Sequence, residues 1–231
     1  MGIIINGKSI ENFYISGEKI NGFVKNKNTI YKGPGYFLLE YIDRDGIKHS
    51  DKASDESEIK PMIKEVSNMM KECKLSSING IKAVFPRGQA IFFDSCPALE
   101  FVDLSDFDAS EMLYMASVFQ YCGALKTVNF SNFNTKSCTT FGGMFKYCSS
   151  LTELDLSSFT TEQVTNFYQM FYDCTSLTKI DLSSFTFNSN QVADYMFDGV
   201  PSDCLIYVKD QTSKNWILNN RNDLTNVQIK E

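Results

Sequence analysis

The sequence predicts an α/β solenoid of 26-residue coils, each made of a strand, a turn and a short helix, with a parallel sheet on one face and a small all-β module in front of it. Three observations lead to this prediction. Apolar residues recur at a fixed 26-residue interval, their spacing changes from two to three within each unit, and the first 32 residues are divided by Asn-Gly and Ser-Gly pairs. No insertion interrupts the register between Phe93 and Val208.

Phenylalanine and cysteine mark two of the apolar columns. Phenylalanine recurs at Phe93, Phe119, Phe145, Phe171 and Phe197. Three residues further along each unit, cysteine recurs at Cys96, Cys122, Cys148 and Cys174, and Val200 fills the fifth place. We expect the rings to form a structural ladder and the cysteines to be buried free thiols, because valine can replace them. A disulfide between stacked cysteines is the alternative. No metal is expected, since there is no Cys-x-x-Cys pair and His49 is the only histidine.

The third unit shows both parts of a coil. Leu154 and Leu156 alternate with polar residues, which predicts a short strand with the leucines turned inward and Glu153 and Asp155 turned outward. After this strand, apolar residues are spaced three, three, one and three apart, which predicts one face of a helix; they are Val164, Phe167, Met170, Phe171 and Cys174. One such unit cannot bury its apolar face alone, so neighbouring units must stack.

Leucines spaced three and then two apart are the signature of leucine-rich repeats. Residues 164–185 read VTNFYQMFYDCTSLTKIDLSSF and resemble the BspA-type leucine-rich repeat, whose pattern runs V-T-N-M-x-x-M-F-x-x-C-x-S-L-x-x-L-D-L-S-x-F. The resemblance covers residues 61–231 and implies a solenoid used for adhesion at a bacterial cell surface. The chain departs from the pattern where Cys138 and Asn190 replace the helix valine and Ala193 replaces an aromatic residue. We expect those coils to pack less well.

We predict four parts in the chain. Residues 61–205 form the repeats, and 61–91 are a degenerate first coil in which Met70 and Cys73 stand in the Phe and Cys columns and Pro61 lies in the first turn of a helix. Residues 206–231 form a final strand and a capping helix. Residues 34–60 form a β-hairpin followed by a polar surface loop at 51–60, for which a calcium site is the less favoured alternative. Residues 1–33 form a small module of β-hairpins.

The N-terminal module carries a second resemblance. Residues 10–20, IENFYISGEKI, and 24–33, VKNKNTIYKG, look like the short strands at the starts of many phage tail and virion proteins. That resemblance implies a docking module that joins the chain to neighbouring virion proteins. A homo-oligomer, if one forms, is expected to assemble through the same module.

Composition excludes several functions. The net charge is −6, with 22 Lys and Arg against 28 Asp and Glu and no basic cluster, so we expect no nucleic-acid partner. No apolar run approaches the roughly 20 residues of a membrane helix, so no membrane insertion is expected. With one histidine and no Gly-rich phosphate loop, we expect no enzyme and no cofactor. The pairs Asp43/Asp45 and Asp106/Asp108 lack a partner base.

The candidate binding residues are the outward positions of the strands on the concave face of the sheet. One column is variable and one is uniformly polar; together they are Phe101, Asp103, Thr127, Asn129, Glu153, Asp155, Lys179 and Asp181. The variable column would set partner specificity, and Phe101 is the best candidate for a binding hot spot unless the preceding coil covers it. The alternative for the polar column, which we favour, is that short polar residues suit a solvent-facing strand and turn.

These observations predict a non-enzymatic protein-interaction module. The first hypothesis is a bacteriophage virion or tail component whose repeats attach to the host surface, to a host protein or glycan, or to another virion subunit, which places the chain in the virion. The alternative is a bacterial cell-surface adhesin that binds host proteins or glycans, and the third is a cytosolic scaffold. The first residues contain no basic region or long apolar stretch of a signal peptide, which favours the first hypothesis over the second if Met1 is the native start.

Overall fold

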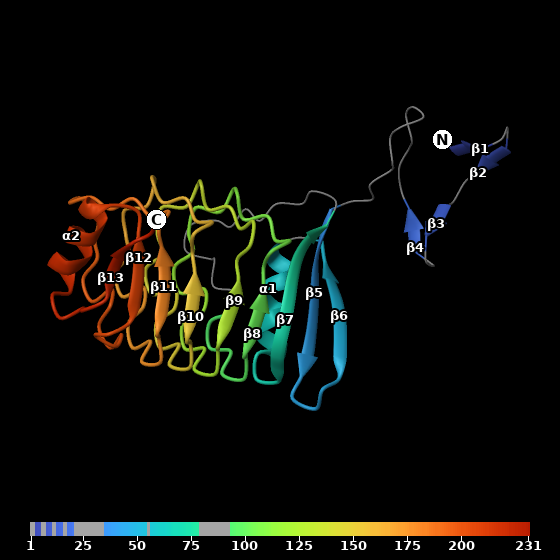
Figure 1. Ribbon diagram of the computed structural model, residues 1–231. Coiled ribbons are helices and arrows are strands. Elements are labelled where there is room, and N and C mark those ends of the chain that lie inside the picture. Colours follow the sequence, from blue (N-terminus) through green and yellow to red (C-terminus); the bar gives the residue numbers. More distant parts are fainter. Residues whose placement is uncertain are drawn as a thin grey trace.

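The computed structural model describes residues 35–54, 56–78 and 93–231, together with four short strands near the N-terminus (Figure 1). The four strands are β1 (Ile3–Ile5), β2 (Lys8–Ile10), β3 (Phe13–Ile15) and β4 (Glu18–Ile20). β1 pairs with β2 and β3 with β4, both antiparallel, so two of the predicted hairpins are present. The predictions for residues 21–34 lie outside the described residues.

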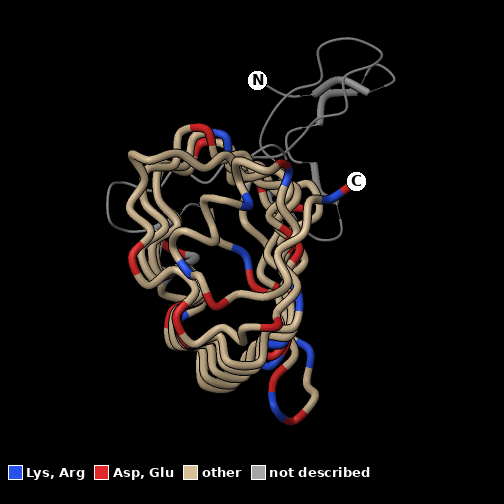
Figure 2. The backbone as a smooth tube through the Cα atoms, turned by 60° about the vertical axis from the view of Figure 1, so that its left-hand side comes forward, with Lys and Arg blue, Asp and Glu red and all other residues tan. Residues whose placement is uncertain are grey.

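The rest of the chain is a solenoid with two sheets along one side. The first sheet has the order β6-β5-β7-β8-β9 and the second has the order β10-β11-β12-β13. The strands are β5 (Tyr36–Asp43), β6 (Lys48–Ala53), β7 (Met70–Ile78), β8 (Phe101–Asp103), β9 (Thr127–Asn129), β10 (Glu153–Asp155), β11 (Lys179–Leu182), β12 (Leu205–Val208) and β13 (Val227–Ile229). From β7 onward all pairs are parallel. Viewed close to the stacking direction, the coils superpose (Figure 2). The predicted solenoid with a parallel sheet on one face is therefore confirmed.

The phenylalanine ladder fills the core as predicted. The rings of Phe93 and Phe119 lie 5.3 Å apart with an interplanar angle of 2°, and those of Phe119 and Phe145 lie 5.5 Å apart. Phe171 continues the stack at 5.9 Å from Phe145 and 5.6 Å from Phe197. A second column of stacked rings runs beside the first; it consists of Phe107, Phe133, Phe159 and Phe185. Each coil thus buries its rings against the coils above and below it.

All seven cysteines are buried free thiols, in agreement with the prediction. In the repeated column the thiol also bonds to the preceding coil. The Cys122 thiol donates to the carbonyl of Phe93 at 2.9 Å, and the Cys148 thiol donates to the carbonyl of Phe119 at 3.1 Å. Burial raises the pKa of the Cys148 thiol well above its usual value, so this thiol stays protonated and inert.

The helical return segments were predicted wrongly. The described part of the chain has two helices, α1 (Glu56–Val66) and α2 (Gln211–Asn220), and each coil returns through a series of turns instead. In the third coil the backbone N–H of Met170 bonds to Phe167 O at 3.0 Å and that of Cys174 to Phe171 O at 3.1 Å, three residues back. The N–H groups of Phe171 and Asp173 point along the stack instead and donate to Met196 O and Asp198 O of the next coil. A helix cannot form where alternate donors are used by a neighbouring coil.

Residues in the left-handed region of backbone space make this alternation possible. Those in the return segments fall into two columns at 26-residue intervals, one of Ser95, Tyr121, Tyr147, Asp173 and Gly199, and one of Ser117, Gly143, Gln169 and Tyr195. Each reverses the local direction of the chain, so that its own N–H faces the next coil while its neighbours bond within their coil. Tyr147 N–H, for example, donates to Tyr172 O, whereas Lys146 N–H and Cys148 N–H bond three residues back. The three-residue apolar spacing therefore reflects successive turns.

The predicted polar loop at residues 51–60 and the predicted first coil also need correction. β6 extends to Ala53 and α1 begins at Glu56, because Glu58 accepts hydrogen bonds from the backbone and the hydroxyl of Ser54 and so caps the start of the helix. Pro61 consequently lies inside α1. Cys73 is in a strand and pairs with Val102, so it belongs to the strand column and not to the cysteine column.

The C-terminal end closes the core. Asp210 caps α2 by accepting a hydrogen bond from the Ser213 N–H at 2.7 Å, and Trp216 of α2 stacks on Phe187 with the ring centres 4.3 Å apart. Phe167 contacts both of these rings, at the level where Ala193 replaces the aromatic residue of the repeat. The expected packing defect is therefore filled by the cap. β13 follows α2 and adds one strand beyond the predicted ending.

Candidate binding face of the sheet

The structure brings the eight predicted binding residues onto the outer face of the two sheets. In each strand the residue between them, such as Val102 or Leu154, is buried. Strand register places them in two rows across the strands. The first row contains Phe101, Thr127, Glu153 and Lys179, and the second contains Asp103, Asn129, Asp155 and Asp181. We call this surface the sheet face.

The polar row also has a structural role. Each of its side chains accepts a hydrogen bond from the backbone N–H two residues later, where the strand turns away. The acceptor–donor pairs are Asp103–Ser105 and Asn129–Ser131 at 3.0 Å, and Asp155–Ser157 and Asp181–Ser183 at 2.9 Å. Such side-chain contacts stabilise turns, which explains the repetition of this column and supports the alternative that we favoured for it.

The two rows are interrupted between β9 and β10, where the two sheets separate. Leu104 N–H bonds to Asn129 O at 2.9 Å and Leu156 N–H bonds to Asp181 O at 3.1 Å, but among the described residues Phe130 N–H has no equivalent bond to β10. A polar cavity of about 350 Å³ opens at this position, bordered by Thr127, Asn129 and Asp155 among others. The predicted binding residues therefore form two groups.

Asp181 is the one predicted binding residue that is buried, and it forms an ion pair with Lys230 after β13. Burial alone would raise the pKa of this carboxyl, but the hydrogen bonds from Lys230 and Ser183 outweigh it and hold the pKa below its usual value. The pair ties the segment after β13 to β11, so the main role of Asp181 is to stabilise the fold and not to contact a partner.

Lys230→Met is expected to lower the free energy of unfolding by about 1 kcal/mol at pH 7, since the half-exposed ammonium keeps part of its hydration. A carboxyl whose pKa is lower in the folded than in the unfolded protein stabilises the fold fully at pH values above the unfolded pKa of about 3.9. This stabilisation is lost as the pH falls through the pKa of the folded state. The difference between wild type and variant should therefore shrink as the pH falls below about 4. Urea unfolding at pH 7 and pH 3 measures it, with Lys214→Met on α2 as the control. A difference that is equal at both pH values would contradict this account.

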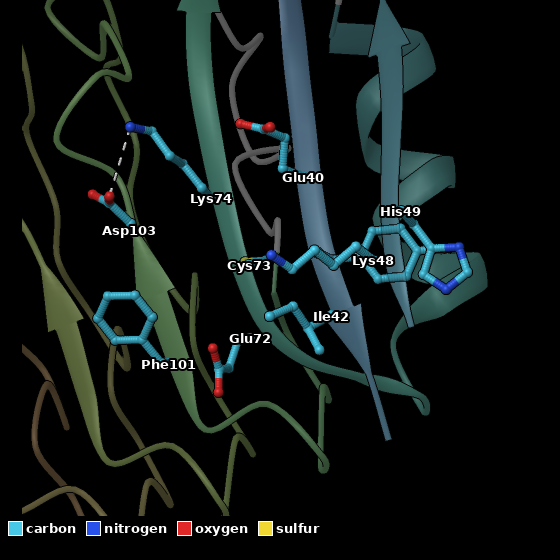
Figure 3. A pocket seen from close by; sticks show the side chains of 10 residues that line it. Glu40, Ile42, Lys48, His49, Glu72, Cys73, Lys74, Phe101 and Asp103 are labelled. Carbon is cyan, nitrogen blue, oxygen red and sulfur yellow. Dashed lines mark ion pairs between the residues drawn. The ribbon is translucent and has the colours of Figure 1, made fainter. Parts of the chain in front are cut away.

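A cavity of about 280 Å³ lies on the sheet face where β5, β7 and β8 run side by side (Figure 3). Phe101 lines it, and so do Ile42 of β5 and Glu72 of β7. Strand register puts Glu72 between the other two, because it pairs with Ile42 on one side and with Phe101 on the other. Phe101 is half-buried.

Further charged side chains surround this row of Ile42, Glu72 and Phe101. Glu40, Lys74 and Asp103 lie in the next cross-strand row, and Lys48 reaches in from β6. The Lys74 ammonium lies 2.5 Å from an Asp106 oxygen and 3.8 Å from an Asp103 oxygen. The hydrogen bond with Asp106 raises the pKa of Lys74, so its positive charge is secured at neutral pH and is used within the chain.

The hairpin between β5 and β6 fixes the far wall of the cavity. Asp43 is buried and accepts backbone hydrogen bonds from Asp45 at 3.0 Å and Ile47 at 2.9 Å, while its other oxygen lies 2.8 Å from His49 Nε2. The His49 ring stacks on Tyr41 with centres 4.5 Å apart. The contact with His49, together with these backbone bonds, lowers the pKa of Asp43. Asp43 therefore holds a turn, and Asp45 extends from it into solvent.

A second exposed surface escaped the sequence analysis. Tyrosines line the return segments on the side away from the sheets, and we call this set the tyrosine edge; it comprises Tyr121, Tyr147, Tyr168, Tyr172 and Tyr195. The rings of Tyr121 and Tyr147 stack 4.9 Å apart, and the Lys146 ammonium lies 5.1 Å from the Tyr147 ring. The recurrence of tyrosine at the 26-residue interval between Tyr121 and Tyr147 was the signal that could have found this edge.

Within the described part of the chain, no three His, Cys, Asp or Glu side chains are grouped to hold a metal ion, and no helix is long and apolar enough to cross a bilayer. A family model described as "Mycoplasma protein of unknown function, DUF285" matches residues 89–204. Comparison with curated proteins and with solved structures gives no significant match. The finer resemblance to BspA-type repeats and the resemblance of the N-terminal hairpins to virion proteins stay predictions. The matched segment spans half of the chain and contains the stacked coils described above, so the chain belongs to the DUF285 family.

Proposed function

We propose that this chain is a non-enzymatic protein-interaction module that binds a partner protein through its sheet face. The observation that carries the proposal is the cavity at Phe101, because it combines a partly exposed aromatic ring with surrounding charged groups on a rigid support. The stacked rings beneath the strands keep the displayed side chains in place before binding, which reduces the entropy lost on association.

The proposed setting is a bacteriophage virion or tail, in which the N-terminal hairpins dock the chain and the repeats contact a host surface or another subunit. The paired strands β1–β2 and β3–β4 support this setting, because short hairpins leave backbone donors and acceptors for pairing with a neighbour. Mass spectrometry of purified particles should detect the chain. Its recovery from washed cell envelopes would instead identify a bacterial adhesin, and its recovery from the soluble cell fraction alone would identify a scaffold; either result overturns the virion proposal.

The binding face can be mapped with the protein that cross-links to the chain in its native assembly. Replacing Phe101, Glu153 and Lys179 together by alanine should weaken this binding about 30-fold or more, the effect expected for losing a hot spot of about 2 kcal/mol. The matched control replaces Tyr121, Tyr168 and Tyr195 by alanine and should leave the affinity unchanged. If the folded sheet-face variant binds normally and the tyrosine variant does not, the tyrosine edge is the binding surface and the proposal is wrong.

A further inference from the structure

We propose that the cavity at Phe101 receives the side chain of an arginine from the partner protein. This inference rests on the proposed function and adds the chemistry of the partner. The cavity volume of about 280 Å³ is at the small end of the range of about 300–1,000 Å³ for small-molecule sites. It suits a single long side chain that anchors a larger interface.

The floor of the cavity matches the shape of arginine. Glu72 lies between Ile42 and Phe101 in one cross-strand row, so a carboxylate is flanked on both sides by apolar groups (Figure 3). An arginine has an aliphatic stem that packs on such groups, and its flat guanidinium can both stack on an aromatic ring and bond to a carboxylate with two N–H groups. A purely apolar side chain would bury Glu72 without a partner.

The charge of the cavity favours a cation. Three of its lining residues are acidic, Glu40, Glu72 and Asp103, and two are lysines, Lys48 and Lys74. Lys74 is already engaged with Asp103 and with Asp106. Within the described ranges neither Glu40 nor Glu72 forms an ion pair, which leaves two carboxylates against the single ammonium of Lys48. An incoming anion would meet net repulsion, whereas an incoming guanidinium would meet attraction.

The test uses the full chain and the blocked peptide acetyl-Gly-Arg-Gly-amide as the probe, followed by the backbone amide signals in NMR spectra at low salt. We expect saturable shifts at Ile42, Glu72 and Phe101. Replacing the arginine by citrulline, which has nearly the same shape without the charge, should weaken binding at least about tenfold, the effect of losing about 1.4 kcal/mol. The lysine peptide should also bind more weakly, because an ammonium is not planar. It can neither stack flat on the Phe101 ring nor form two parallel hydrogen bonds to the Glu72 carboxylate. Equal binding of the citrulline, lysine or leucine peptide would overturn the assignment.

Two variants locate the site. Glu72→Gln and Phe101→Leu should each weaken binding of the arginine peptide, and both keep a side chain of similar size in the sheet. Glu162→Gln, an exposed carboxylate on a turn after β10, is the matched control and should bind like wild type. If the arginine peptide does not bind but the cross-linked partner still needs Phe101, Glu153 and Lys179, the proposed function stands and the arginine inference is wrong. If the partner does not need these three residues, the proposed function is wrong.

Discussion

Phe171→Ala is expected to lower the free energy of unfolding by about 3–5 kcal/mol. Phe171 is fully buried, and its ring stacks on Phe145 on one side and Phe197 on the other, 5.9 and 5.6 Å away. Its removal leaves a cavity in the middle of the ladder, and two neighbouring coils lose a stacking partner at once. Because each coil is held only by its neighbours, damage to an internal coil weakens the whole array.

Urea unfolding of Phe171→Ala and Glu153→Ala measures this effect. Glu153 is exposed on β10, so its replacement should change stability by no more than about 0.5 kcal/mol. Phe171→Leu keeps most of the apolar volume and should fall between the two variants. Equal midpoints for the phenylalanine and glutamate variants would mean that Phe171 does not support its neighbouring coils and would contradict the stacked core.

The repeat could be predicted from the sequence because buried positions are restricted to apolar residues. A column such as Phe119 and Phe145 must remain apolar in every coil, so its period gives the coil length and the parallel register. The backbone hydrogen bonds of the return segment do not restrict the residue types in this way. Phe171 N–H can donate to Met196 O only when the next coil is in place, and turns and helices both put apolar residues about three apart. Glycine marks only two of the left-handed positions in the return segments, Gly143 and Gly199, so the composition did not reveal the turns.

The candidate site could be predicted only in part for a related reason. Phe101 was identified because it is an apolar residue at an outward position of a repeated strand. Its neighbours Ile42 and Glu72 come from β5 and β7, outside the regular array. Glu72 pairs with Phe101 at a separation of 29 residues, whereas Phe101 pairs with Thr127 at 26. Extending the 26-residue period toward the N-terminus therefore misplaced the strand that completes the cavity.

Gly199→Ala is expected to lower the free energy of unfolding by about 2–5 kcal/mol, the second of the two large effects. Gly199 has φ +82°, a conformation that costs other residues about 1–2 kcal/mol. A Cβ added there would lie 2.8 Å from Asp173 Cα and 3.0 Å from Asp173 N, so the backbone of the preceding coil would have to move. Overpacking of this kind costs about 1–3 kcal/mol more.

Gly46→Ala is the matched control for Gly199→Ala. Gly46 has nearly the same conformation, φ +78°, but a Cβ there would meet nothing within 4 Å, so only the backbone cost of about 1–2 kcal/mol applies. Gly143→Ala should resemble Gly46→Ala, since the nearest atom, Ser117 Oγ, is 3.4 Å away. Urea unfolding of the three variants separates the two contributions, because the excess cost at Gly199 measures the close approach of adjacent coils. If Gly199→Ala is no worse than Gly46→Ala, the backbone at Gly199 moves freely away from Asp173, and the last coil is not held against the one before it.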